Sequence, residues 1–309
     1  MDAVTFPTFS DPPSAATLRW IEKCLGRGSE VKMVRPMIGG LAHVNHAVLA
    51  ESRSGTVHRL VLRRWASSGW PVLDIDVSPE LEIAALTLLT ACEIPTPALV
   101  AADPSGAHCD VPALLITRLP GHPPRPSCAE LPEYLVQLAA ALLPVHAVDG
   151  ASTMPPYRAY NRLEIRLAPR HARRPALWEH ALDVAAGPTP GAAPRFIHRD
   201  YQPDNTLWAG GRLTGIVDWS NAAYGPVAID IAHIRRALAL RYDVTVADRF
   251  SASFDQVSGG YRHDPYWDLR TVLDLLPEQP DRTIAARDIP ALEDLLDHAL
   301  VDLGAPARF

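Results

Sequence analysis

The sequence has no long apolar run, no excess of basic residues and no closely spaced pair of cysteines. The apolar stretch 135–145 is too short to cross a bilayer, and residues 1–7 carry neither a basic start nor an apolar core. The net charge of −6, with a pI near 6.0, gives no general attraction to nucleic acids or anionic lipids. We therefore expect a chain that binds neither membranes nor nucleic acids.

Cysteine is scarce and scattered. No C-x-x-C pair occurs, and no histidine lies at zinc-like spacing, so the pattern indicates neither a metal site nor a disulfide framework. Reduced thiols and a cytoplasmic location are expected. The four residues are Cys24, Cys92, Cys109 and Cys128.

What the sequence does contain is typical of a globular protein with two lobes. Its 309 residues exceed the size at which one hydrophobic core usually keeps growing. Apolar residues make up 48% and charged residues 21%, which disfavours disordered and fibrous classes. The chain has 30 prolines and 18 glycines, which indicates many loops bounded by proline.

Short β-rich segments dominate the first part of the chain. Ser14 can cap a helix over residues 15–25, and Ser78 followed by Pro79 predicts a second helix that ends near residue 92. Strands are expected at residues 31–37, 44–50, 58–65, 99–102 and 112–117.

From residue 131 onward the pattern becomes helical. A hairpin at 205–207 and 213–217, turned at Gly210 and Gly211, interrupts it. A linker near residues 118–121 predicts an N-terminal lobe at 1–118 and a C-terminal lobe at 119–309, giving an α+β fold with a ligand cleft expected between the lobes. Helices are expected at 131–146, 160–167, 177–186, 228–240 and 289–303.

Residues 198–205 (HRDYQPDN) carry the clearest chemical signal. They have the form H-R-D-x-x-x-x-N, and Asp218 ends an apolar strand one hairpin later, as in kinases that place a base and two magnesium ligands around ATP. Asp200 is the expected base for an acceptor hydroxyl. Asn205 and Asp218 are expected to bind Mg²⁺ through oxygen, and His198 to shape the loop.

Each of these residues alone also has an ordinary structural explanation. Asp200 and Asp204 could cap turns, and His198 could be a satisfied core histidine. Asp218 could cap the segment after its strand. The joint spacing favours the chemical interpretation, with Asp204 facing solvent or helping in a minor way.

With several other stretches, this motif resembles the aminoglycoside phosphotransferase and choline kinase-like family of small-molecule kinases. The resemblance implies a protein-kinase-like bilobal fold, with a small β-rich N-terminal lobe containing one helix and a larger, mainly helical C-terminal lobe. It also implies ATP and Mg²⁺ as cofactors, and transfer of the γ-phosphoryl group to a hydroxyl of a small molecule. The other stretches are residues 37–45, 60–63, 82–86, 94–97 and 217–219.

A protein kinase is a poorer match, because D-W-S replaces D-F-G at residues 218–220 and no activation segment ending in A-P-E follows. A nucleotide-binding pseudokinase or binding module, without phosphoryl transfer, is the alternative function. The intact residues Asp200, Asn205 and Asp218 argue against it.

The sequence indicates the residues that would bind the nucleotide less clearly. Gly39 and Gly40 lie between two strands, where backbone amides could approach phosphates, although a plain tight turn explains them equally well. Arg63 stands where kinases place the strand lysine. Arg64 is the alternative if the strand register differs by one residue.

Further positions complete the expected site. Glu82 is the expected partner of the strand arginine, with Glu80 as second choice because an acid there also suits the helix dipole. The resemblance implies that the backbone from Thr117 to Leu119 binds adenine and that Asp230 supports the catalytic loop. An ordinary acid at a helix start is the other explanation of Asp230.

Two charged groups give opposite indications of the acceptor. A basic stripe at Arg162, Arg166, Arg170, Arg173 and Arg174 favours an anionic substrate, or is a solvated face. A group of acidic and aromatic residues favours a cationic amine as the acceptor. The alternative is that these acids lie at helix ends and the aromatic residues belong to the core. That second group comprises Asp255, Asp264, Asp268, Asp274, Tyr261, Tyr266 and Trp267.

Overall fold

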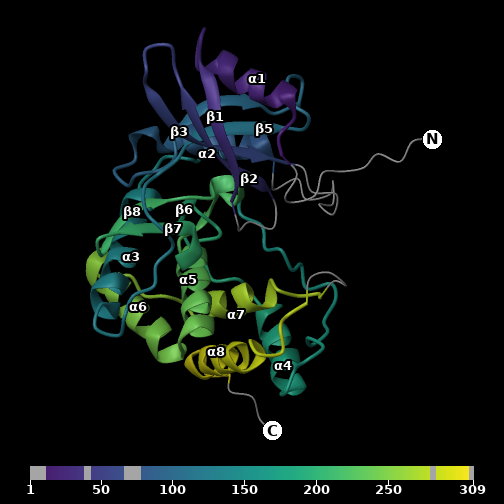
Figure 1. The fold of residues 1–309 in the computed structure, drawn as a ribbon. Coiled ribbons are helices and arrows are strands. Elements are labelled where there is room, and N and C mark those ends of the chain that lie inside the picture. Colours follow the sequence, from purple (N-terminus) through teal and green to yellow (C-terminus); the bar gives the residue numbers. More distant parts are fainter. Residues whose placement is uncertain (1–11, 38–42, 66–77, 279–282, 306–309) are drawn as a thin grey trace, which may run out of the picture. The chain divides into compact units, whose positions relative to one another are not determined.

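A computed structural model describes residues 12–37, 43–65, 78–278 and 283–305 (Figure 1). The chain divides into two compact units. The first contains residues 1–120 and 214–221, and the second contains residues 121–213 and 222–309. Residues 214–221, which the sequence assigned to the second lobe, therefore pack within the first unit.

The first unit is built on a five-stranded antiparallel sheet. All five strands expected from the sequence are present, and their spatial order is β1-β2-β3-β5-β4. Their bounds are β1 (Glu30–Pro36), β2 (Val44–Glu51), β3 (Val57–Arg64), β4 (Leu99–Asp103) and β5 (Ala113–Thr117).

In the described part of this unit there are two α-helices, and both begin at the serine caps expected from the sequence. In α1 (Ala15–Cys24), the Ser14 side chain accepts a hydrogen bond from the Thr17 amide. Ser78 caps α2 (Pro79–Leu88), which continues into the short 3₁₀ helix η1 (Leu89–Ala91). The buried side chains of α1 pack against apolar residues of β2, β3 and β5, which makes a core on one face of the sheet.

The second unit is mainly helical, as expected, and one of its buried apolar clusters includes residues of α5 and α7. A short β6–β9 pair precedes α5, and β7 and β8 form a hairpin that turns at Gly210 and Gly211, with residues 214–216 of β8 belonging to the first unit. The bounds are α3 (Leu131–His146), α4 (Pro175–Ala185), β6 (Pro194–Ile197), β7 (Thr206–Ala209), β8 (Arg212–Ile216), β9 (Ala223–Pro226), α5 (Ala228–Arg241), α6 (Val244–Ser258), α7 (Tyr266–Leu273) and α8 (Ile289–Asp302).

The helix predicted at residues 160–167 was wrong. Leu163 has φ 61°, in the left-handed region, and its amide donates to the Asn161 side chain. The Asn161 amide donates in turn to the buried carboxylate of Asp274. Contacts with distant residues thus override the local helical spacing. Helices α6 and α7 were not predicted, although Asp243 caps α6 and Gly259 ends it in the left-handed conformation.

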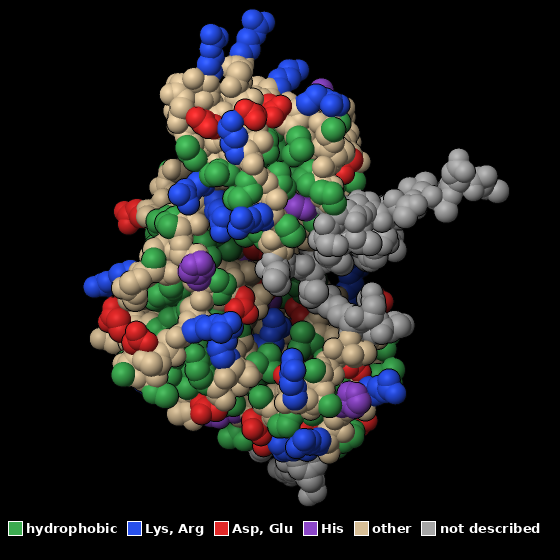
Figure 2. Space-filling model, viewed as in Figure 1, with side chains coloured by type: hydrophobic (Ala, Val, Ile, Leu, Met, Phe, Trp, Pro, Cys, Tyr) green, Lys and Arg blue, Asp and Glu red, His purple; other side chains and the backbone are tan. Residues whose placement is uncertain are grey.

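The surface carries mixed charge. On the face shown in Figure 2, Lys and Arg side chains are interspersed with Asp and Glu side chains over both units. None of the helices in the described ranges is both long and apolar enough to span a membrane. The four cysteines are all free thiols.

Candidate active site

The loop that follows β6 is held by one buried carboxylate. Asp230, in the first turn of α5, accepts hydrogen bonds from the His198 amide at 3.0 Å and the Arg199 amide at 2.8 Å. Arg199 has φ 65°, a conformation that a non-glycine residue rarely adopts. Because both amides are fixed by Asp230, the loop keeps this strained turn and presents Asp200 immediately after it.

Asp230 is itself held by His146, the last residue of α3. The His146 Nε2 atom lies 2.8 Å from Asp230 Oδ2, and both side chains are buried. Burial raises the pKa of Asp230, but the contacts with His146 and His198 outweigh it and hold the pKa below its usual value. Asp230 is therefore a charged residue in the protein interior.

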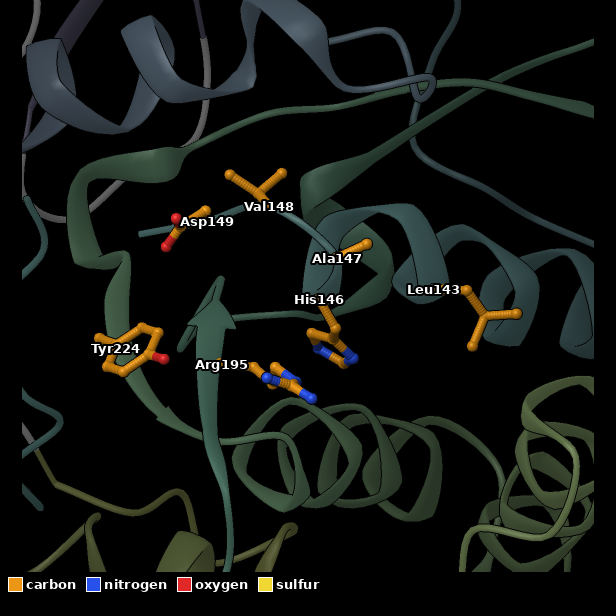
Figure 3. A pocket seen from close by; sticks show the side chains of 7 residues that line it. All are labelled: Leu143, His146, Ala147, Val148, Asp149, Arg195 and Tyr224. Carbon is orange, nitrogen blue, oxygen red and sulfur yellow. The ribbon is translucent and has the colours of Figure 1, made fainter. Parts of the chain in front are cut away.

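A pocket of about 510 Å³ opens beside His146. Its lining side chains include His146 from α3, Arg195 from β6 and Tyr224 from β9 (Figure 3). The pocket therefore borders the side chain that supports Asp230.

Asp200 and Asn205 are brought together by the loop. The Asn205 Nδ2 atom donates to the Asp200 backbone oxygen at 2.8 Å and to Asp200 Oδ2 at 3.0 Å. The amide nitrogen is thus turned toward Asp200, which leaves the amide oxygen as the atom of Asn205 suited to a hard cation. Asp204, by contrast, forms an exposed ion pair with Arg241, in line with its expected solvent-facing position.

In the first unit, Arg63 joins two acids. Its Nη1 atom lies 2.7 Å from Glu82 Oε1 and 2.8 Å from Asp218 Oδ1, and its Nε atom donates to Asn45 Oδ1 at 3.2 Å. Arg63 and Glu82 are buried, whereas the Asp218 side chain is 23% exposed. Burial raises the pKa of Glu82 to about 6, although the charge of Arg63 opposes that shift.

The alternation of β3 separates Arg63 from Arg64. Successive side chains of a strand point to opposite faces, so Arg63 reaches Glu82 on α2 while Arg64 lies on the face covered by α1. There Arg64 Nη1 donates to Asp110 at 2.8 Å, and Asp110 also contacts Thr17. The structure therefore brings Arg63 and Glu82 together, as the sequence suggested. Their role with a nucleotide stays a prediction.

Asp218 follows β8 in a strained conformation, with φ 68°. Its Oδ1 atom accepts hydrogen bonds from Arg63 and, at 3.0 Å, from Ser220 Oγ. A carboxylate oriented in this way suits a magnesium ion, because hard cations prefer oxygen ligands. No group of three or more His, Cys, Asp or Glu side chains forms a metal site within the described ranges.

Two of the three backbone amides expected to bind adenine already donate hydrogen bonds within the first unit. The Thr117 amide donates to Ala98 at 2.9 Å, and the Arg118 amide donates to Arg59 at 3.0 Å. Of the three amides, that of Leu119 alone makes no hydrogen bond with a residue in the described ranges. Leu119 is therefore the best placed donor. Gly39 and Gly40 lie outside the described residues.

Neither charged group proposed for the acceptor forms the expected surface. The helix that would carry the basic stripe is absent, and Arg166 pairs instead with Asp183 at 3.0 Å. Asp268 is buried and bound to Arg235 and His263, so its charge is already balanced. Arg166 and Asp268 thus each have an oppositely charged partner within the protein.

A model of one protein family matches residues 43–266, well over half of the chain, and its description is "Phosphotransferase enzyme family". The chain belongs to this phosphotransferase (APH) family. The match confirms the resemblance drawn from the motif at residues 198–205. No curated protein matches the chain.

Solved structures confirm the fold of this family member. A thermostable mutant of aminoglycoside phosphotransferase APH(4)-Ia, in complex with ADP and hygromycin B, is 15% identical, with a TM-score of 0.61, 93% of this chain covered and 98% of that one. Macrolide 2'-phosphotransferase MphH from Brachybacterium faecium is 20% identical, with a TM-score of 0.58 and coverages of 85% and 88%. ADP-bound APH(2'')-Ib is 13% identical, with a TM-score of 0.55 and coverages of 93% and 98%. The kinase-like fold expected for the chain is thereby established.

Three residues of these clusters were not singled out from the sequence. Asn45 was noted only as part of a motif stretch, although it holds Arg63. His146 ends a helix with no local sign of its partner, which lies 84 residues away. His233 is buried 3.7 Å from Asp200. Its spacing of three residues from Asp230 was the available signal, since residues i and i+3 share a helix face.

Proposed function

We propose that the chain is an ATP- and Mg²⁺-dependent phosphotransferase that moves the γ-phosphoryl group to a hydroxyl of a small molecule. The observation that carries the proposal is the geometry of the loop at residues 198–205. Asp230 fixes its strained turn, and Asn205 fixes the carboxylate of Asp200. Membership of the phosphotransferase family supports the same reaction.

Asp200 is the proposed base. Its side chain is 25% exposed, so an acceptor hydroxyl can reach it. As the hydroxyl oxygen attacks the γ-phosphorus and the bond to the β-phosphate oxygen breaks, the hydroxyl proton passes to the Asp200 carboxylate. Because Asn205 holds the Oδ2 atom, the carboxylate stays oriented during this transfer.

Arg63 is the proposed phosphate ligand. Its Nη1 and Nε atoms are committed to Glu82, Asp218 and Asn45, whereas Nη2 makes no hydrogen bond with any residue of the described ranges. Nη2 can therefore donate to a phosphate oxygen while the acids keep the guanidinium in place. In this proposal, Nη1 and Nε hold the buried guanidinium in place through two carboxylates and an amide oxygen, and Nη2 contacts the phosphate.

Asn205 and Asp218 would hold Mg²⁺ through an amide and a carboxylate oxygen, which fits the donor preference of this ion. When bound, Mg²⁺ neutralises charge on the phosphate groups. The Leu119 amide is the proposed donor to adenine. Gly39 and Gly40 stay proposed phosphate contacts.

A screen for ADP release, with ATP and Mg²⁺, tests this function. The acceptors are aminoglycosides, macrolides, amino alcohols, sugars and hydroxyacyl thioesters, each assayed with the wild type and Asp200→Asn. We expect at least one class to stimulate ADP release by the wild type and not by Asp200→Asn. A thermal shift with ATP and Mg²⁺ but no turnover with any class would instead indicate a nucleotide-binding module.

A further inference from the structure

His233 is a buried histidine that faces the proposed base and has no part in the function described above. It lies on α5, three residues after Asp230, so both side chains project toward the loop at residues 198–205. Its exposed fraction is 5%, and its Nδ1 atom lies 3.7 Å from Asp200 Oδ1. One helix face thus carries two side chains directed at the same loop.

The Nδ1 atom of His233 is an unsatisfied polar atom. It is buried and makes no hydrogen bond with any residue that the structure describes. A buried polar atom that is left unpaired destabilises the folded state, so a hydrogen-bond partner for Nδ1 is favoured. The 3.7 Å separation from Asp200 exceeds the usual N–H···O distance of about 2.9 Å by less than 1 Å, so a small rotation of the carboxylate closes it.

The two oxygens of Asp200 have different surroundings. Oδ2 accepts hydrogen bonds from Asn205 at 3.0 Å and Gln202 at 3.3 Å, both from the same loop. Oδ1 accepts none from the described part of the chain, and His233 Nδ1 faces it. A carboxylate oxygen has two lone pairs, so Oδ1 can accept from His233 and still receive the acceptor proton.

The charges around His233 favour a neutral ring. Burial lowers the pKa of His233, and Arg236 on the same helix lowers it further. Asp200 and the buried Asp274, which follows α7, act in the opposite direction without reversing the shift. A neutral imidazole carries one N–H group, and the carboxylate facing Nδ1 favours the tautomer with that proton on Nδ1.

We propose that His233 is a positioning residue that donates a hydrogen bond from Nδ1 to Oδ1 of Asp200. This inference rests on the proposed role of Asp200 as the base. With Asn205 on one oxygen and His233 on the other, the carboxylate is fixed from two sides, by the loop and by α5. Catalysis is sensitive to such placement, because a 1 Å displacement can cost roughly 100-fold in rate.

Three substitutions separate positioning from packing. In His233→Asn the side-chain amide nitrogen takes the place of Nδ1, whereas His233→Gln places it farther out and His233→Leu removes it. We expect His233→Gln and His233→Leu to lower kcat by about 10- to 100-fold, with KM for ATP and acceptor unchanged within about twofold. His233→Asn should retain kcat within about threefold of the wild type. Thermal denaturation of all three variants controls for folding.

A second readout does not depend on turnover. In the ¹⁵N spectrum of histidine-labelled protein, the His233 signals are assigned by their absence from His233→Asn. The wild type should show the proton on Nδ1, and Asp200→Ala should move it to Nε2. If no acceptor supports turnover, the proposed function fails while this tautomer shift still reports the contact.

The inference is overturned if His233→Leu keeps the wild-type kcat, or if Asn, Gln and Leu lower kcat equally. It is also overturned if the wild-type tautomer carries its proton on Nε2, or if Asp200→Ala leaves the tautomer unchanged.

Discussion

Replacing Arg63 with methionine tests the buried charge cluster of the first unit. The substitution leaves Glu82, which is 1% exposed, without its cation, and the Glu82 Oε2 atom is already without a hydrogen-bond partner in the described ranges. Breaking a buried ion pair by removing one partner costs about 3–5 kcal/mol. Asp218 adds little to this cost, because its side chain is 23% exposed and water can screen it.

The loss of stability in Arg63→Met should depend on pH. Burial already raises the pKa of Glu82 to about 6 from its ordinary value of 4.5. Loss of Arg63 removes an opposing charge and raises that pKa further. An acid whose folded-state pKa is raised favours folding below its unfolded-state pKa, and this contribution is lost as pH rises through the folded-state value. The stability deficit of Arg63→Met should therefore be larger at pH 8 than at pH 5.

Urea denaturation at both pH values provides the assay. The matched control is Arg59→Met, since Arg59 lies on the same strand with an exposed side chain, and its loss should stay within about 0.5 kcal/mol. The double variant Arg63→Met/Glu82→Leu removes both charges and should be more stable than Arg63→Met alone. A loss for Arg63→Met no greater than that for Arg59→Met would refute a buried, charged cluster.

Three other predictions concern Asp230, Gly215 and the proposed metal ion. Asp230→Asn should lower the free energy of unfolding by about 1–3 kcal/mol at pH 7. The folded-state pKa of Asp230 is held below its ordinary value of 3.8, so the stability that its charge contributes is present above pH 3.8 and is lost as the pH falls through the folded-state pKa. In urea denaturation, the difference in unfolding free energy between wild type and Asp230→Asn should therefore shrink only in acid. Gly215→Ala should cost about 1–3 kcal/mol in thermal denaturation, since the new Cβ would clash with Leu119 and lie 2.9 Å from the Pro95 oxygen, whereas Gly191→Ala meets nothing within 4 Å. Chelation by EDTA should abolish phosphoryl transfer and added Mg²⁺ should restore it; transfer that persists under chelation would contradict a magnesium-dependent reaction.

Local patterns predicted the first unit well. The serine caps at Ser14 and Ser78 and the five strands depend on short-range propensities, which the structure retains. The choice between Arg63 and Arg64 needed the strand register, and one residue of difference moves the side chain to the other face of the sheet.

Contacts between distant residues explain what sequence patterns missed in the second unit. Residues 160–167 have helix-like spacing, but a hydrogen bond from the backbone amide of Asn161 to Asp274, 113 residues away, favours a non-helical backbone. A distant contact also changes the expected role of the acidic and aromatic residues. Arg235, 33 residues away in the sequence, neutralises the charge of Asp268. The motif at residues 198–205 predicted the loop itself, while its support by His146 became visible only in the folded chain.

Transfer of the γ-³²P label from ATP tests the central proposal most directly. Wild type and Asp200→Asn are incubated with labelled ATP, Mg²⁺ and an acceptor that stimulates ADP release, and the products are separated by chromatography. We expect label on the acceptor hydroxyl with the wild type, and none above background with a folded Asp200→Asn variant. Equal labelling by both proteins would contradict Asp200 as the base, and release of labelled phosphate without any labelled acceptor would contradict a small-molecule phosphotransferase.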